Sequence, residues 1–245
     1  MQQRNTVEFV VYGRYALFSD PITRMGGEKL SYTIPTYQAL KGILESVYWR
    51  PTFIWYIDAM RIMNKVQTES KGIRPIKYSG GNDLSSYTYL RDVRYQVQAH
   101  FEWNEHRPEL VQDRNEHKHH NIAKRMIERG GRRDVFLGTR ECQGYVDPCV
   151  FGEGDGFYDQ YGQWDMGIMF HGFDYPDEVG SDQMARRFWR ALMVDGVVKF
   201  TDPRHIPSEL RSVIKEMKPK QFESSSGFSE PIKLEPAKVI ARAGE

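Results

Sequence analysis

One short run of titratable residues stands out in this chain: Asn115-Glu116-His117-Lys118-His119-His120, with three imidazoles and one ammonium in four consecutive positions. Imidazole has an unperturbed pKa close to neutral pH, so it can give or take a proton there. A lysine ammonium can hold a phosphate. The run therefore indicates acid–base chemistry on a phosphodiester. The competing interpretation, which composition alone favours, is a solvated loop or helix face.

A metal site is the less favoured chemistry for this run. His117 and His120 are three residues apart, but no acidic or cysteine ligand stands at a diagnostic spacing beside them. Cys142 and Cys149 fit neither a zinc spacing nor a disulfide framework. A metal-free nuclease instead needs a proton-transfer group and a cation for the phosphorane, and one His with one Lys can supply most of that. We therefore expect neither metal nor cofactor.

Two further features bear on nucleic-acid chemistry. The segment from Gly130-Gly131-Arg132-Arg133 to Gly138-Thr139-Arg140 combines glycines, which let backbone approach a phosphate, with guanidiniums that match its oxygens. A helix stop followed by ordinary surface arginines explains this segment equally well. Tyr48 continues an apolar helical stripe. Its simplest interpretation is a core tyrosine.

The bulk composition limits the function classes. The chain has 245 residues and a formal net charge of +1, so any nucleic-acid site must be a local patch. Its length allows one large domain or two small ones. No apolar run reaches the length of a membrane span, and the N-terminus has no apolar signal region. The cytoplasm is the expected compartment.

Periodicity predicts an α+β N-terminal domain over residues 1–150. Strands are expected at 6–18, 53–57 and 93–103, where apolar and polar residues alternate in the last. A helix begins at Pro35-Thr36, carries its apolar stripe to Val47 and ends before Pro51. A second helix over 121–129, stopped by Gly130-Gly131, precedes a strand around 135–137.

The resulting order, β-α-β-β-α-β, is that of a ferredoxin-like or RRM-like domain. Residues 64–87 interrupt it as a long insertion, Gly/Ser-rich at Ser79-Gly80-Gly81-Asn82. Insertions of this length are more often functional or mobile than structural.

A second unit is expected over residues 151–220, and its strands follow the Gly-rich segment 152–156. Strands at 164–173, 187–194 and 197–200 predict a small antiparallel sheet, with Asp195-Gly196 as a two-residue hairpin turn. Residues 221–245 are polar and proline-rich, which predicts a flexible tail.

Longer motifs connect the chain to a known family. The motifs are Gly26-Gly27-Glu28-Lys29-Leu30-Ser31-Tyr32, Pro35-Thr36-Tyr37-Gln38-Ala39-Leu40-Lys41-Gly42, Gly130-Gly131-Arg132-Arg133-Asp134, Arg140-Glu141-Cys142-Gln143-Gly144-Tyr145 and Gly154-Asp155-Gly156-Phe157-Tyr158-Asp159. In these motifs the chain resembles the subtype I-C (Dvulg) members of the Cas-five family of CRISPR-associated proteins, from about Val7 to Lys220.

The resemblance implies a RAMP-superfamily protein with an RRM-like N-terminal domain and a small β-sheet C-terminal domain. It implies a pre-crRNA endoribonuclease that cuts at the 3′ base of the repeat hairpin without metal. The protein would then stay on the crRNA 5′ handle, beside the backbone and large subunits of the type I-C surveillance complex. Members of the family also bind duplex DNA, which adds duplex DNA as a candidate partner.

The family's catalytic trio of Tyr, Lys and His matches Tyr48, Lys118 and His119. The expected mechanism is attack of the ribose 2′-hydroxyl on the adjacent phosphate, leaving a 2′,3′-cyclic phosphate and a 5′-hydroxyl. His119 would transfer the proton and Lys118 would stabilise the phosphorane. Tyr48, with a reference pKa of about 10, suits hydrogen bonding better than general base catalysis. His117 and His120 leave the choice of imidazole open.

The RNA-binding residues expected beside this trio are Arg114, Arg132, Arg133 and Arg140. Two other functions stay open. The first is a non-catalytic structural subunit that binds the crRNA 5′ handle. The second is a general RRM-like RNA-binding module, although residues 93–103 lack the paired aromatics of the usual central-strand consensus.

Overall fold

The computed structural model describes residues 5–21 and 28–219. The expected tail over 221–245, and Gly26 and Gly27 of the first family motif, lie outside the described residues. The elements run β1 (Thr6–Ala16), β2 (Lys29–Leu30), α1 (Tyr37–Val47), β3 (Phe53–Ile62), β4 (Thr68–Ile73), β5 (Ser85–Trp103), the 3-10 helix η2 (Pro108–Asp113), α2 (Glu116–Glu128), β6 (Val135–Phe136), β7 (Gln143–Pro148), β8 (Gln163–Asp174), α3 (Pro176–Val179), β9 (Gln183–Val194), β10 (Val197–Lys199), η3 (Pro203–His205), η4 (Ser208–Leu210) and β11 (Arg211–Glu216).

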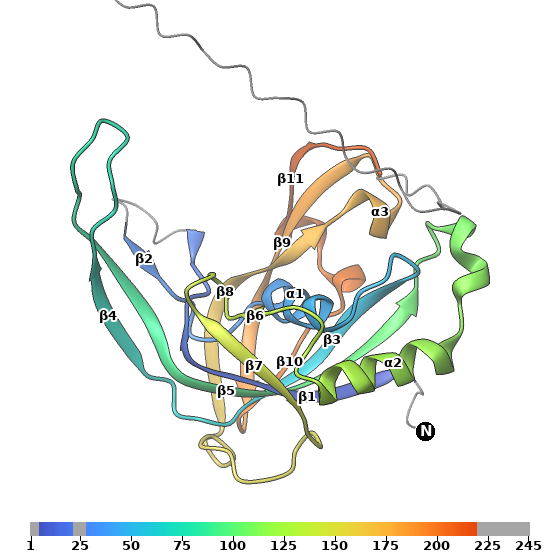
Figure 1. Ribbon diagram of the computed structural model, residues 1–245, viewed down its shortest axis with the longest axis horizontal. Helices are drawn as coiled ribbons and strands as arrows, with labels where there is room; N and C mark the ends of the chain where they lie inside the picture. Colours follow the sequence, from blue (N-terminus) through green and yellow to red (C-terminus); the bar gives the residue numbers. More distant parts are fainter. Residues whose placement is uncertain (1–4, 22–27, 220–245) are drawn as a thin grey trace, which may run out of the picture.

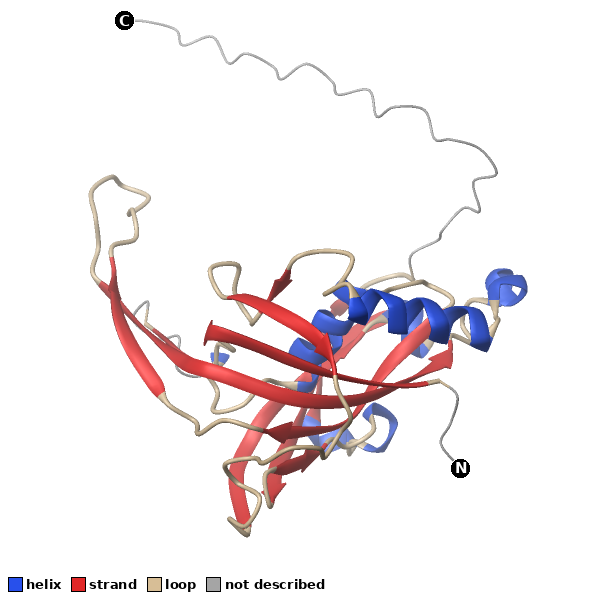
Figure 2. Cartoon of the chain, turned by 60° about the horizontal axis from the view of Figure 1, so that its bottom comes forward, coloured by secondary structure: helices blue, strands red, loops and turns tan. Residues whose placement is uncertain are grey.

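A large, mostly antiparallel sheet with few helices forms the body of the protein (Figures 1 and 2). Its main path is β11-β9-β10-β3-β5-β1-β7-β6, while β2 and β4 pair with β5, and β8 pairs with β9. Helix α1 packs on β3 and β8, α2 packs on β1 and β7, and the two helices contact each other. The sequence predicted an α+β protein, and the combination of helices with a largely antiparallel sheet is confirmed.

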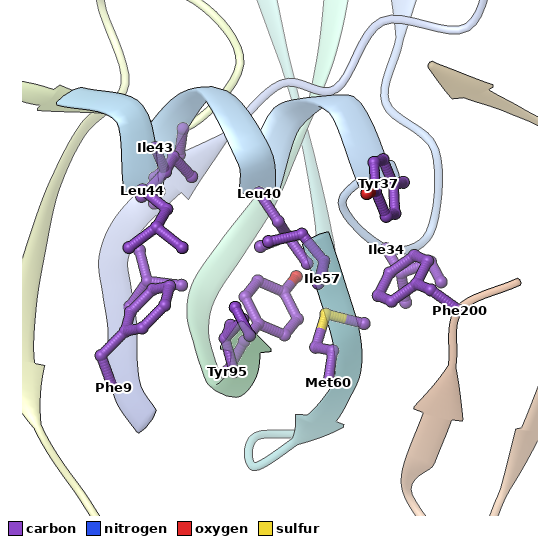
Figure 3. Packing of buried hydrophobic residues seen from close by; sticks show 14 of the residues in the cluster. Phe9, Ile34, Tyr37, Leu40, Ile43, Leu44, Ile57, Met60, Tyr95 and Phe200 are labelled. Carbon is purple, nitrogen blue, oxygen red and sulfur yellow. The ribbon is translucent and has the colours of Figure 1, made fainter. Parts of the chain in front are cut away.

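Helix α1 covers the apolar face of the central strands. Thr36 caps it, since its side-chain oxygen accepts a hydrogen bond from the Ala39 backbone N–H at 3.1 Å. Figure 3 shows Leu40 and Leu44 facing Phe9 of β1 and Tyr95 of β5. The apolar stripe of this helix therefore seals the core, as the sequence periodicity predicted.

The sequence predicted a long insertion over residues 64–87 but no strand within it, and the structure places β4 there. Strand β4 pairs with the first part of β5, from Thr68↔Leu90 to Ile73↔Ser85. Strand β5 therefore begins at Ser85, not near Val93, and the two strands form an arm that projects from the sheet (Figure 1). Alternating exposed and half-buried residues in β4 gave too weak an apolar signal for the sequence to show a strand.

The C-terminal hairpin is confirmed, but its strands do not form a separate three-stranded sheet. Strands β9 and β10 pair around Asp195 and Gly196 as predicted. Strand β10 then pairs with β3 through Val197↔Arg61, and the unpredicted β11 pairs with β9. Strands on both sides of residue 150 thus belong to one sheet, and the division into domains at that position stays a prediction.

Helix α2 begins at Glu116, five residues earlier than the predicted 121. Asn115 caps it by accepting a hydrogen bond from the Lys118 backbone N–H at 3.0 Å. Gly130 and Gly131 end it with φ values of 76° and 108°, as the glycine pair predicted. The His/Lys run therefore lies in the first turns of a helix that packs on the sheet.

Candidate active site

Tyr48 and His119 meet in the interior, although 71 residues separate them in the chain. Tyr48 is the extended residue that ends α1, and His119 lies in the first turn of α2. The Tyr48 hydroxyl is 2.8 Å from Nδ1 of His119. The Tyr48 side chain is nearly buried and His119 has no exposed surface. The interpretation of the run as a solvated helix face is wrong for His119.

An aromatic enclosure surrounds the imidazole of His119. The ring of Phe53 lies 5.2 Å from it, that of Trp103 5.8 Å and that of Phe101 6.5 Å, between centroids. Together with Tyr48, these rings exclude water from the imidazole. Hydrogen bonds in such surroundings are stronger than in water, and an unpaired polar atom there is costly.

The hydrogen bonds of His119 define which ring nitrogen carries the proton. Nε2 is 2.8 Å from the backbone oxygen of Asp113. A carbonyl oxygen can only accept, so Nε2 is the donor. In the neutral imidazole, Nδ1 then accepts a hydrogen bond from the Tyr48 hydroxyl. The arrangement places a proton acceptor directly against the phenol.

The protonation state of Tyr48 follows from the same burial. Burial raises the pKa of the Tyr48 phenol above its usual value, and this effect outweighs the neighbouring Arg50 and Lys118 cations, which lower it. The phenol therefore keeps its proton at neutral pH. This agrees with a hydrogen-bonding role and not with a free phenolate base.

Lys118 lies on the rim of the site, with about half of its side chain exposed (51%). Its Nζ is 2.6 Å from Oδ1 of Asp113, and the Thr52 hydroxyl donates to Oδ2 at 2.7 Å. Burial acts to raise the pKa of the Asp113 carboxyl, but the hydrogen bonds from Lys118 and Thr52 outweigh it, and the pKa is lowered. Asp113 is therefore an anion that holds the ammonium in place.

The other two imidazoles of the run point elsewhere. His117 is exposed on α2. Nε2 of His120 is 3.0 Å from the Thr6 backbone oxygen, which directs the ring toward β1. Burial lowers the pKa of His120, and the charge of Lys124 adds to this effect against the opposing hydrogen bond to Thr6. Among the three, His119 is the imidazole that contacts Tyr48.

The predicted RNA-binding arginines occupy three different environments. Arg132 and Arg133 are exposed and line a hollow of about 530 Å³ together with Arg50. Arg114 is largely buried (15% exposed) and its guanidinium binds the Glu105 carboxylate at 2.9 Å. Arg140 lies in the turn before β7, with its guanidinium 5.7 Å from the centre of the Phe136 ring.

Trp49 and Arg50, which directly follow Tyr48 in the chain, form part of the wall of this hollow. Sequence reasoning missed Arg50 as a partner of Arg132 and Arg133. It also missed Asp113 and Thr52, because single Asp and Thr residues carry no pattern. The guanidiniums of Arg50, Arg132 and Arg133 form a local basic patch on a chain whose net charge is only +1.

The Gly-rich motif from Gly154 to Asp159 has a structural explanation. The Arg61 guanidinium of β3, which is nearly buried, binds the Asp159 carboxylate at 2.6 Å and the Gly154 backbone oxygen at 2.7 Å. Arg61 therefore fixes this segment against β3.

Comparisons with known proteins agree on one family. The Cas5d family model, described as CRISPR-associated protein (Cas_Cas5), matches residues 6–201. The CRISPR pre-crRNA endoribonuclease Cas5d of Mannheimia succiniciproducens is 26% identical over 224 residues, which cover 79% of this chain and 94% of that protein. The Thermus thermophilus protein of the same name is 27% identical over 149 residues, which cover 56% of this chain and 62% of that protein.

Two solved structures resemble the chain closely. A structure titled "Crystal Structure of CRISPR-associated Protein" has 36% identity and a TM-score of 0.72, and the match covers 84% of this chain and 96% of that one. A functionally uncharacterized protein from Streptococcus mutans has 38% identity and a TM-score of 0.70 with the same coverage.

Proposed function

Because this chain belongs to the Cas5d family of CRISPR-associated proteins, we propose that it is a pre-crRNA endoribonuclease. Relatives that carry this name match most of the chain. The observation that carries the proposal is the Tyr48–His119 hydrogen bond beside the exposed Lys118 ammonium. This is the trio that the family resemblance implies, gathered from two elements far apart in the sequence.

We propose that cleavage follows 2′-hydroxyl attack without a metal. The 2′-oxygen bonds to phosphorus, its proton is accepted by the protein, and the bond to the 5′-oxygen breaks with return of a proton. The products are a 2′,3′-cyclic phosphate and a 5′-hydroxyl. Lys118, exposed and anchored, stabilises the charge on the phosphorane.

The enclosure of His119 suggests how the proton moves. The imidazole has no exposed surface, and its Nδ1 is occupied by the Tyr48 hydroxyl. We infer that the phenol relays the proton: it passes its own proton to Nδ1 while it accepts one from the RNA, and the reverse occurs for the leaving oxygen. This relay gives Tyr48 a role in which its raised pKa is no obstacle, since no free phenolate forms.

The RNA is proposed to lie across the rim formed by Lys118 and the hollow of Arg50, Arg132 and Arg133. We propose the repeat hairpin as the substrate, cut at its 3′ base, and the crRNA 5′ handle as the retained product within the surveillance complex. Duplex DNA remains a candidate partner. For the fold, we interpret β7-β1-β5-β3 with α1 and α2 as a ferredoxin-like (RRM-like) core, an interpretation that the strand order supports.

The decisive experiment is incubation with the repeat RNA in EDTA, followed by analysis of the fragment ends. We expect cleavage in chelator, a 2′,3′-cyclic phosphate, and complete loss of cleavage when the 2′-hydroxyl at the cut site is replaced by hydrogen. Activity that disappears in EDTA and returns with magnesium contradicts the proposed mechanism.

The alternative function is a non-catalytic subunit that binds the crRNA 5′ handle. The full enclosure of His119 favours it, because no imidazole nitrogen faces solvent. Tight binding of the repeat RNA without any cleavage, at every pH tested, would establish this alternative.

A further inference from the structure

One acidic residue contacts two members of the trio. Asp113, the last residue of η2, binds Lys118 through its carboxylate and His119 through its backbone oxygen. We propose that Asp113 is a positioning residue for the cleavage reaction, which holds the ammonium and the imidazole in their working geometry. This inference rests on the proposed function and adds to it a residue outside the trio.

The carboxylate is itself fixed from two sides. Oδ1 lies 2.6 Å from Nζ of Lys118, and Oδ2 accepts the Thr52 hydroxyl at 2.7 Å. Thr52 is almost fully buried (1% exposed) and directly precedes β3. Because Thr52 belongs to the core, its hydrogen bond keeps the Asp113 carboxylate in place. The ion pair then holds the Lys118 ammonium at a defined position on the rim.

The same residue orients the imidazole. The Asp113 backbone oxygen accepts the Nε2 proton of His119 at 2.8 Å, and the Asn115 backbone N–H at 2.9 Å fixes that oxygen. Oδ2 lies 3.4 Å from Nε2, so a negative charge adjoins the ring when Nδ1 receives a proton. The backbone oxygen thus fixes the tautomer and the carboxylate stabilises the protonated ring, whereas in a Ser-His-Asp triad the Asp carboxylate does both.

A purely structural role for the carboxylate accounts poorly for these contacts. Asn115 already caps α2, so the helix does not need the Asp113 side chain for this purpose. The ion pair with Lys118 joins two partly exposed side chains (51% and 33%). Such pairs contribute little to stability. Removal of the Asp113 charge should therefore lower the cleavage rate more than it lowers the stability of the fold.

The test is Asp113→Asn, which keeps the size and the hydrogen-bond acceptor for Thr52 but removes the charge. We expect the single-turnover cleavage rate at saturating protein to fall roughly 10- to 100-fold, by analogy with the loss of groups that orient metal-bound histidines. The affinity for the repeat RNA should change less than about 2-fold and the melting temperature by less than about 3 °C, as for a surface ion pair. Asp113→Glu, which retains the charge, should recover part of the rate.

The matched control is Asp165→Asn. Its carboxylate also binds a cation and a second donor, Arg190 at 2.8 Å and the Gly167 backbone N–H at 2.9 Å, but on the C-terminal strands. This variant should cleave at the wild-type rate. If Asp113→Asn lowers the melting temperature severely, Thr52→Val provides the second variant, and a rate loss of about 3- to 10-fold is expected from the freed carboxylate.

Each result has a distinct meaning. Wild-type cleavage together with an Asp113→Asn rate within about 2-fold of wild type, or a faster one, overturns the positioning role and leaves the proposed function standing. A wild-type protein that does not cleave, or Lys118→Ala and His119→Ala variants that cleave normally, overturns the proposed function itself.

Discussion

Replacement of Tyr48 by Phe tests the relay directly. It removes one hydroxyl and leaves Nδ1 of His119 without its partner at 2.8 Å, inside an enclosure with no exposed surface. An unsatisfied buried acceptor costs about 1–3 kcal/mol. For a chain of this size, each kcal/mol lowers the melting temperature by about 2–4 °C, so a fall of about 2–12 °C is expected. The variant should therefore remain folded at assay temperature.

The effect on cleavage should be much larger than the effect on stability. If the phenol carries the proton between the RNA and His119, Tyr48→Phe and His119→Ala each remove the whole relay. We expect each to lower the single-turnover rate by roughly 10²- to 10⁴-fold, the usual contribution of general acid–base catalysis. The double variant should be no slower than either single variant, because residues that act as a unit are not additive.

The measurement is a single-turnover rate at saturating protein, with RNA affinity and melting temperature determined for each variant. Tyr12→Phe is the matched control, since it also removes a tyrosine hydroxyl hydrogen bond, to Asp147 at 2.9 Å, on another part of the sheet. A Tyr48→Phe rate within a few-fold of wild type, beside an inactive His119→Ala, refutes the relay and shows that RNA reaches the imidazole directly. Losses that multiply in the double variant refute it equally.

Four further outcomes are expected. Arg132→Ala with Arg133→Ala should weaken RNA binding and flatten its salt dependence, because fewer counterions are released; an unchanged slope would place the RNA elsewhere. His117→Ala should cleave at nearly the wild-type rate in the same assay, since that side chain is exposed on α2. Burial lowers the pKa of His171 to about 3, so the protein loses up to about 1.4 kcal/mol of stability per pH unit as the pH falls from about 6.5 toward 3. Burial raises the pKa of Glu45 to about 7, so its contribution has the opposite sign and stability falls as the pH rises from about 4.5 to 7. In unfolding titrations, His171→Gln should reduce the loss of stability in acid, Glu45→Gln should reduce the loss toward neutral pH, and unchanged slopes would contradict these assignments.

The elements predicted correctly are those whose signals are local. The Thr36 cap with the apolar stripe to Val47, the alternation of β5 after Val93, and the Asp195-Gly196 turn each depend on neighbours within a few residues. Such patterns report the backbone conformation without knowledge of the fold. The arm of β4 was missed because its residues are held by pairing with β5 and not by an apolar face of their own.

The Tyr, Lys and His of the proposed site could be named from the family resemblance, because matching residue types and their order requires no knowledge of the distances between the side chains. The burial and hydrogen bonds of these side chains could not be predicted in the same way. His117 and His119 differ by two positions on one helix, yet one is exposed and the other is enclosed, because the rotation of α2 against β1 and β7 directs only one toward the core.

The same limit applies to charges. The sequence does not distinguish Arg114 from Arg132. In the structure the Arg114 guanidinium binds Glu105, whereas Arg132 lines the hollow that Arg50 also lines. The Asp113 carboxylate contacts Lys118 and Thr52 because the tertiary structure places η2, α2 and the start of β3 side by side. Side-chain type and local periodicity are properties of the chain alone, whereas burial, tautomer and ion pairing depend on long-range packing, which brings groups 71 residues apart to hydrogen-bond distance.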